Sequence, residues 1–237
     1  ERRTANKLIE EFMLLANQTV AEHFFWMEVP FIYRVHEAPT LRKMEEFRTF
    51  LRGFGLSVKG TAGSVHPRTL NEILKSVEGK SYENVVNTVM LRSMQKAYYG
   101  TECDGHFGLA LNYYCHFTSP IRRYPDLFIH RVIKACLHGT LDADSMEHFR
   151  KKAQEAADTA SATERTAIEL EREVEKMKKA EYMADRIGAR YDGIISGVTG
   201  FGIYVQLENT VEGMIRLDTL LDDYYIHEPE KYRLIGE

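Results

Sequence analysis

Residues 145–187 contain neither glycine nor proline, and this run constrains the fold more than any other feature of the chain. A continuous helix of that length would extend for roughly 60 Å, at about 1.5 Å per residue. Its apolar residues form one narrow seam and the rest is largely Glu, Lys and Arg, so much of the helix should face solvent. Gly188 is expected to end it. The seam consists of Ala167, Leu170, Val174, Met177, Ala180, Ala184 and Ile187.

Helical patterns also dominate the first half of the chain. Residues 2–29 lack glycine and proline and carry apolar residues at helical spacing, which predicts a long amphipathic helix. Residues 29–35 are β-branched and aromatic, which predicts an extended segment. Further helices are predicted with Thr40 as the N-terminal cap, near Pro67 and after Ser81.

The pattern changes after Gly188. Residues 191–196, 202–207 and 211–215 are strand-like runs separated by glycine-bearing turns. They predict a small antiparallel barrel with its boundary near Gly188. Because only three strands are visible, we expect the barrel to be incomplete.

Composition excludes several classes of protein. Three cysteines are too few for a disulfide framework, which favours a reducing, cytoplasmic compartment. No apolar run approaches the roughly 18 residues that a membrane span needs, so we expect no membrane association. The net charge of −4 excludes a wholly basic nucleic-acid coat but allows a local basic groove. The chain opens at Glu1 without a methionine, so we expect a fragment.

The densest polar segment is in the middle of the chain. Alternating apolar residues over 107–113 predict a strand, and Ser119-Pro120 is typical of a helix start. Arg122 and Arg123 would then lie in the first helical turn, where they oppose the helix dipole. One interpretation is that they bind an anion such as a phosphate. The other is that they pair with Asp126 or are simply exposed.

The same segment carries a family resemblance. It reads His106-Phe107-Gly108-Leu109-Ala110, then His116-Phe117-Thr118-Ser119-Pro120-Ile121-Arg122-Arg123-Tyr124-Pro125-Asp126-Leu127, and closes with His130-Arg131. It resembles the signature of the RNase II/RNase R (RNB) family of exoribonucleases, processive hydrolases that work from the 3′ end. Residues 8–17, residues 31–36 and the long final helix are similar to the RNase R type.

The resemblance implies an α+β fold in two domains. Residues 1–187 would be the C-terminal part of an RNB catalytic domain, with helices and a mixed sheet. Residues 188–237 would be an incomplete S-one type OB-fold RNA-binding domain, a partial β-barrel. The implied activity is 3′→5′ hydrolysis of RNA to nucleoside 5′-monophosphates. The partners would be single-stranded and structured RNA, and we expect a monomer.

Metal binding is expected to lie elsewhere in the protein. The family holds magnesium with a cluster of aspartates upstream of the region seen here. The only close aspartate pairs are Asp142/Asp144 and Asp222/Asp223, which we interpret as solvated turn residues. We therefore expect magnesium to be bound by residues outside this chain, and the chain alone to be inactive. A zinc site at Cys103, His106, Cys115 and His116 is disfavoured, because two of these residues are adjacent.

Two residues match the family's catalytic positions. Arg122 would hold the phosphate at the scissile bond, with Arg123 as a weaker candidate that could instead form an ion pair. Glu171 matches an active-site glutamate. It lies four residues after Ala167 and three before Val174, so it borders the apolar seam. The alternative is that Glu171 is one more surface glutamate.

The remaining candidates would bind RNA. Glu10 and Glu11 match a pair of glutamates in the family, of which one contacts ribose. The alternative interpretation is that both are charges on the outer face of the helix. Tyr114 and His116 fit the signature, but we favour packing beneath the arginines. The resemblance implies that Phe201 and Tyr204 stack on RNA bases. The alternative interpretation is that they only pack a face of the barrel. Arg216 stands where the family usually has histidine, and Asp218 where it has serine.

A function from another class stays open. The chain could be a non-catalytic RNA-binding or assembly module derived from this family. An aspartate cluster upstream of Glu1 would favour the enzyme, and its absence the module.

Overall fold

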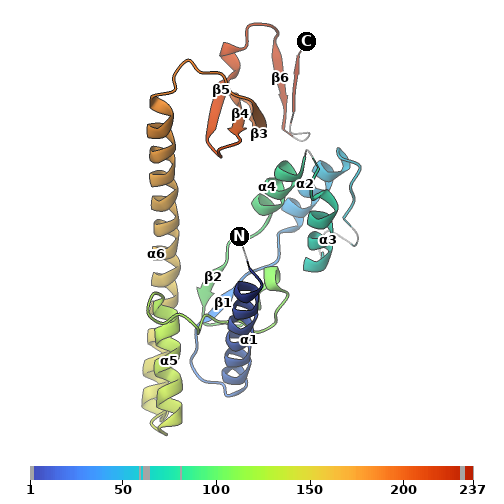
Figure 1. Ribbon diagram of the computed structural model, residues 1–237. Helices are drawn as coiled ribbons and strands as arrows, with labels where there is room; N and C mark the ends of the chain where they lie inside the picture. The colour runs from blue at the N-terminus through green and yellow to red at the C-terminus, as the bar shows by residue number, and fades with distance from the viewer. Residues whose placement is uncertain (1–2, 59, 61–64, 81, 230–232, 237) are drawn as a thin grey trace. The chain divides into compact units, whose positions relative to one another are not determined.

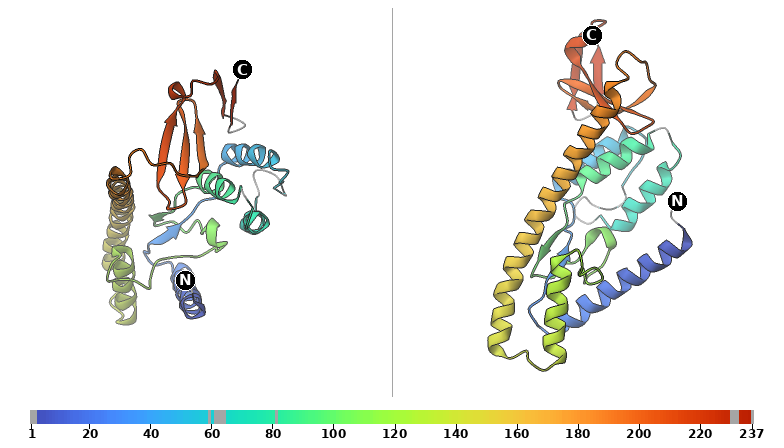
Figure 2. Two further views of the ribbon diagram at one scale, coloured as in Figure 1. Left: turned by 45° about the horizontal axis from the view of Figure 1, so that its top comes forward. Right: turned by 60° about the vertical axis from the view of Figure 1, so that its left-hand side comes forward.

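The computed structural model describes residues 3–58, 60, 65–80, 82–229 and 233–236. Helices and small antiparallel sheets make up an α+β architecture (Figures 1 and 2). The chain divides into two compact units, each built from two separate stretches of sequence. Unit 1 comprises residues 1–38 and 95–171, and unit 2 comprises residues 39–94 and 172–237.

Unit 1 is mainly helical and holds the main hydrophobic core. Its two short strands pair antiparallel, with Tyr33 opposite Gly100. Its elements are α1 (Thr4–Trp26), β1 (Tyr33–Val35), β2 (Tyr98–Gly100), a 3₁₀ helix (Phe107–Leu109), α5 (Tyr124–Leu137) and the larger part of α6 (Ala143–Ala184). The core includes Ala21, Phe24, Phe31, Ile32, Val35, Cys115, Phe128, Ile129, Val132, Ala153 and Ala157.

Helix α6 is continuous over 42 residues, which confirms the long helix. Its first part lies beside α5, where the rings of Phe128 and Phe149 meet edge to face (Figures 1 and 2). The apolar seam predicted over residues 167–187 is not the buried face of α6, because Leu170 and Met177 are exposed. The buried residues lie earlier and are small, which allows the neighbouring elements to approach closely. They are Ala153, Ala156, Ala157 and Ser161.

Helix α1 shows a similar shift. It begins at Thr4 and ends at Trp26, close to the predicted bounds. Its buried residues are Asn17, Ala21 and Phe24, all in its second half. The expected stripe in the first half, which includes Phe12, is exposed in the part of the chain that the structure describes.

The predicted strand over residues 107–113 is wrong. His106 accepts the amide N–H of Leu109 on its ring Nδ1 and caps the 3₁₀ helix, which ends at Ala110 in the left-handed conformation with φ of 56°. Gly108 donates its N–H to Nδ1 of His36 at 2.9 Å. A Cβ at Gly108 would lie 2.8 Å from that nitrogen. Side-chain hydrogen bonds from two histidines therefore replace the strand ladder.

The helix expected at Ser119-Pro120 begins five residues later, at Tyr124. The carbonyl of Ser119 accepts the N–H groups of both Arg122 and Arg123, which makes residues 119–123 a turn. Pro125 lies in the first turn of α5. The two arginines therefore precede the helix rather than occupying its first turn.

Among the described residues, unit 2 contains three complete α-helices, the C-terminal end of α6 and two small sheets. Thr40 caps α2 by accepting the N–H of Lys43, which confirms the predicted start. The sheets are antiparallel, with strand orders β3-β4-β5 and β6-β7. The elements are α2 (Leu41–Arg52), α3 (Pro67–Val77), α4 (Glu83–Ser93), β3 (Gly193–Thr199), β4 (Gly202–Leu207), β5 (Glu212–Arg216), β6 (Tyr225–Glu228) and β7 (Arg233–Gly236).

The three predicted strands correspond to β3, β4 and β5. Strands β6 and β7 were not predicted, because each is only four residues long and mixes charged with apolar side chains. Within the described residues the two sheets are not joined into a closed barrel. A partial OB-fold therefore stays a prediction.

Two further findings concern the environment of the chain. No helix in the described ranges combines the length and the apolar character that a membrane crossing requires. Cys103, Cys115 and Cys136 are all free thiols, as the composition predicts.

Candidate functional site

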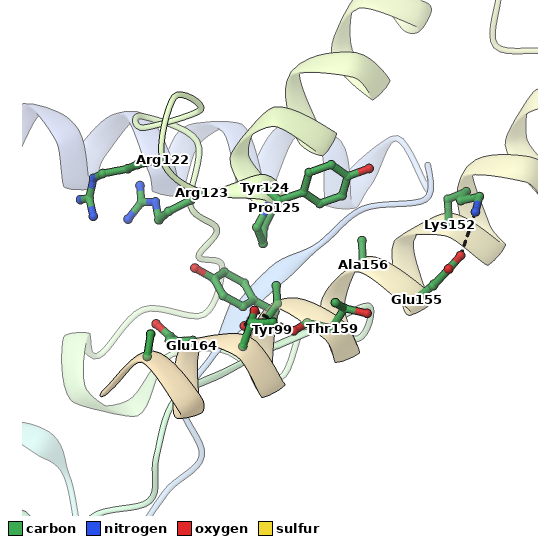
Figure 3. A pocket seen from close by; sticks show the side chains of 13 residues that line it. Tyr99, Arg122, Arg123, Tyr124, Pro125, Lys152, Glu155, Ala156, Thr159 and Glu164 are labelled. Atoms are coloured by element: carbon green, nitrogen blue, oxygen red, sulfur yellow. Dashed lines mark hydrogen bonds and ion pairs between the residues drawn. The ribbon is translucent and has the colours of Figure 1, made fainter. Parts of the chain in front are cut away.

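A cavity of about 730 Å³ lies in unit 1, between the 119–123 turn and helix α6 (Figure 3). Arg122 and Arg123 occupy one side, α6 forms the other, and the Tyr99 ring lies between them. The wall is a mixture of charged, aromatic and small residues. It is formed by Tyr99, Arg122, Arg123, Tyr124, Pro125, Lys152, Glu155, Ala156, Thr159, Ala160, Thr163, Glu164 and Ala167.

Arg122 is an exposed arginine of this cavity. Its backbone N–H is held by the carbonyl of Ser119, but its guanidinium has no hydrogen bond or ion pair with any residue that the structure describes. A planar guanidinium offers five N–H donors in a fork that matches phosphate oxygens. The chain therefore presents an anion-binding group on a fixed turn.

Arg123 forms an ion pair with Asp126, which was one of the two interpretations drawn from the sequence. Its Nη2 donates to Oδ1 of Asp126 at 2.8 Å, and the Asp126 side chain is fully buried. The same carboxylate oxygen accepts the N–H of Ser119 at 2.7 Å. Asp126 thus ties the two ends of the turn together and fixes the backbone from which Arg122 projects.

Tyr114 and His116 lie beneath the arginine turn. Nδ1 of His116 and the hydroxyl of Tyr99 are hydrogen-bonded at 2.9 Å, and Tyr114 accepts a hydrogen bond from Asn17 at 3.2 Å. Burial, with the positive charges of Arg123 and Arg34 next, lowers the pKa of His116 to about 3. His116 is therefore neutral at neutral pH, and both side chains occupy packing positions.

The structure adds an ion pair that sequence reasoning missed. Nη1 and Nη2 of Arg34 donate to the two carboxylate oxygens of Glu164 at 2.6 and 3.0 Å. The Arg34 guanidinium also lies 4.6 Å from the centre of the Tyr99 ring. No local pattern marks this pair, because Arg34 and Glu164 are 130 residues apart in the sequence.

Glu171 does not line the cavity. The lining residues of α6 end at Ala167, one turn earlier, and Glu171 is exposed on the helix surface. Glu10 and Glu11 lie on α1, where Glu10 is half-buried and Glu11 is exposed. Neither is a lining residue of the cavity. The structure therefore brings Arg122 and Arg123 together at the cavity. Glu10, Glu11 and Glu171 lie outside its lining.

The candidates of unit 2 lie on the β3-β4-β5 sheet. Phe201 is 65% exposed in the turn between β3 and β4. Tyr204 is half-buried on β4, opposite Met214 of β5. Arg216 ends β5, and its Nε and Nη2 donate to the two carboxylate oxygens of Asp218 at 3.0 and 2.6 Å. Asp218 thus occupies the guanidinium face that a phosphate would otherwise use.

The described residues do not fit a magnesium ion. They contain no group of three or more His, Cys, Asp or Glu side chains that could hold a metal. Asp142 accepts the N–H of Ser145 at the start of α6, and Asp222 accepts the hydroxyl of Tyr225. Both aspartates therefore have local turn roles, and the cysteine–histidine segment 103–116 forms no metal group either.

Two family models match the chain. The RNB domain model matches residues 1–139, and the S1 RNA binding domain model matches residues 184–236. Because the RNB model covers more than half of its length, the chain belongs to the RNB family. The RNB match does not reach residue 187 and does not support the expectation that residues 1–187 are the C-terminal part of that domain.

Relatives that match the whole chain carry the name ribonuclease R. Ribonuclease R 1 of Lactococcus lactis is 45% identical over 236 residues, which is 100% of this chain and 29% of the relative. The structure of Mycoplasma genitalium RNase R with ribose methylated single-stranded RNA matches with a TM-score of 0.92 and 30% identity, covering 98% of this chain and 37% of that one. The same protein with double-stranded RNA matches with a TM-score of 0.81 and 26% identity, over 99% and 42%. The chain thus spans about a third of these relatives.

Proposed function

We propose that this chain is part of a processive 3′→5′ exoribonuclease that hydrolyses RNA to nucleoside 5′-monophosphates. The observation that carries the proposal is the guanidinium of Arg122, which faces a cavity without a protein partner in the described residues. Membership of the RNB family and relatives named ribonuclease R support this assignment. Single-stranded and structured RNA are the proposed partners, in line with the two RNA complexes of the Mycoplasma protein.

The proposed role of Arg122 is to hold the phosphate at the scissile bond. Hydrolysis increases the negative charge on the phosphate oxygens as the attacking oxygen approaches and the leaving oxygen departs. A guanidinium already fixed beside these oxygens stabilises that charge without reorganising during the reaction. Asp126 and the 119–123 turn supply the fixed position, because they anchor the backbone on both sides of Arg122.

Magnesium would contribute charge stabilisation at the attacking and leaving oxygens. Since the described residues do not fit this ion, we assign its ligands to parts of the full-length protein beyond this chain. The role proposed for Arg122 does not depend on the ion. The chain alone is then expected to bind phosphate without cleaving RNA.

The other candidates keep proposed roles. Glu171 would act near the phosphates from the turn of α6 that follows the cavity, and either Glu10 or Glu11 would contact ribose. Phe201 and Tyr204 would stack on bases in the S1 unit, where such stacking tolerates any sequence. Arg216 would add a phosphate contact only when Asp218 releases it.

The test is the substitution Arg122→Ala in the full-length protein. Removing a group that acts mainly in the transition state is expected to lower kcat by about 10²–10³-fold. RNA affinity, measured by fluorescence anisotropy, should change far less. Arg122→Lys should rescue only part of the rate, because an ammonium lacks the planar fork.

Two results would count against the proposal. Equal losses of affinity and turnover in Arg122→Ala would make Arg122 a general binding residue. Wild-type protein that binds RNA but never shortens it with magnesium present would favour the non-catalytic RNA-binding module.

A further inference from the structure

Four cations gather at the cavity, and carboxylates neutralise three of them. Arg122, Arg123 and Lys152 line it, and Arg34 lies against Tyr99 behind the wall. Among the described residues, Arg122 alone of the four has no carboxylate partner. The three pairs are Arg123–Asp126 at 2.8 Å, Lys152–Glu155 at 2.9 Å and Arg34–Glu164 at 2.6 Å.

The Arg34–Glu164 pair differs from the other two because its carboxylate lines the cavity while its cation is buried behind the lining. Glu164 is a lining residue of the cavity. Arg34 is not, and the Arg34 side chain is only 13% exposed. The Asp126 carboxylate is fully buried and is not a lining residue of the cavity. The Lys152–Glu155 pair is exposed on both sides, and such pairs hold their partners weakly. Glu164 is therefore the carboxylate that separates a buried cation from a ligand in the cavity.

We propose that Glu164 is a specificity-determining residue of this cavity. By engaging both Nη groups of Arg34, it leaves Arg122 as the single arginine at the cavity without a carboxylate partner among the described residues, so the two arginines do not bind two RNA phosphates together. The inference rests on the proposed function, in which an RNA phosphate occupies the Arg122 side. A second phosphate contact would strengthen ground-state binding without favouring the transition state, and a processive enzyme would then release and advance its substrate more slowly.

The first variant is Glu164→Gln in the full-length protein, with a short single-stranded RNA as the probe. Glutamine keeps the size of the side chain and one acceptor for Arg34 but removes the charge. We expect tighter RNA binding at low salt, and lower KM together with lower kcat. Each new phosphate contact should steepen the slope of log affinity against log salt concentration by about 0.7 for single strands.

The second variant is Arg34→Gln, which leaves the Glu164 carboxylate uncompensated in the wall. It should weaken RNA binding, the opposite direction to Glu164→Gln. The double variant should return the salt slope to the wild-type value, because the second cation is gone. Glu173→Gln is the matched control, since Glu173 also lies on α6 and pairs with Lys176 at 2.9 Å outside the cavity. It should change neither slope nor rate.

The outcomes separate the two proposals. If Glu164→Gln and Arg34→Gln both weaken binding and the salt slope is unchanged, the pair only supports the fold and the inference is wrong. This comparison of directions remains valid if either variant loses thermal stability. Wild-type protein that neither binds nor shortens RNA would instead overturn the proposed function itself.

Discussion

Asp126 is the residue on which the geometry of the candidate site depends. Its fully buried carboxylate receives both the Ser119 N–H and the Arg123 guanidinium on one oxygen. A buried charge of this kind is costly unless it is paired and hydrogen-bonded. Both conditions are met at Oδ1, whereas Oδ2 is buried without a hydrogen-bond partner among the described residues. The contacts at Oδ1 hold the turn that carries Arg122 at the cavity.

Asp126→Ala should therefore destabilise the protein strongly. Removing one member of a buried pair leaves the other charge uncompensated, which typically costs about 3–5 kcal/mol. The free energy of unfolding, measured by urea denaturation, should fall by that amount. Asp144→Ala, at an exposed position in the first turn of α6, is the control and should change it little. A loss of less than about 1 kcal/mol, the range of exposed pairs, would show that Asp126 is not the anchor of the turn.

At the scale of elements, the long helix was predictable and its buried face was not. The absence of glycine and proline over 145–187 is a local property that determines helix formation. Burial depends on which elements pack against the helix, and here the small residues Ala153 and Ala157 meet the core. Large apolar residues such as Leu170 contribute more to an apolar pattern than alanines do. The pattern therefore placed the buried face closer to the C-terminal end of the helix than the structure does.

The polar segment shows a different limit. Its motif located the cavity residues Arg122 and Arg123, but alternation over 107–113 predicted a strand that does not form. The cause is non-local, since His36, far away in sequence, receives the N–H of Gly108. Glu164 was missed for a similar reason, because its partner Arg34 comes from β1. Contacts between distant segments leave no signal in local periodicity.

The β3–β4 turn offers a test of RNA stacking at the scale of an element. Phe201→Ala in the full-length protein should weaken binding of long RNA by about 1–3 kcal/mol for each base it stacks. Thermal stability should be nearly unchanged, because Phe201 is 65% exposed. Cleavage of very short oligonucleotides should stay near the wild-type rate. Binding is measured by anisotropy and unfolding by differential scanning fluorimetry.

Tyr204→Ala is the companion variant. Tyr204 is half-buried opposite Met214, so its loss should lower both RNA affinity and thermal stability. Normal affinity for long RNA in both variants, with lower stability, would show that these aromatic residues only pack the sheet.

At the scale of the whole molecule, the proposed function needs both charge at the phosphate and metal ions. The chain supplies one unpaired arginine and several neutralised cations around the cavity, yet its described residues contain no group that could hold a metal. Position and charge from an arginine lower a hydrolysis barrier only in part. In the proposed function, the chain would supply one wall of the site, and we assign the remaining parts to the rest of the full-length protein.

The chain as given is accordingly expected not to hydrolyse RNA, with or without added magnesium. Attack of water on a phosphodiester without metal ions keeps most of its uncatalysed barrier, and one guanidinium offsets only a small share of it. The experiment incubates the purified chain and the full-length protein with end-labelled RNA and magnesium or manganese. A preparation of the chain carrying Arg122→Ala reveals any contaminating nuclease, since contamination would not depend on Arg122. Stepwise shortening from the 3′ end by the wild-type chain, absent in that variant, would show that a complete metal site lies within residues 1–237.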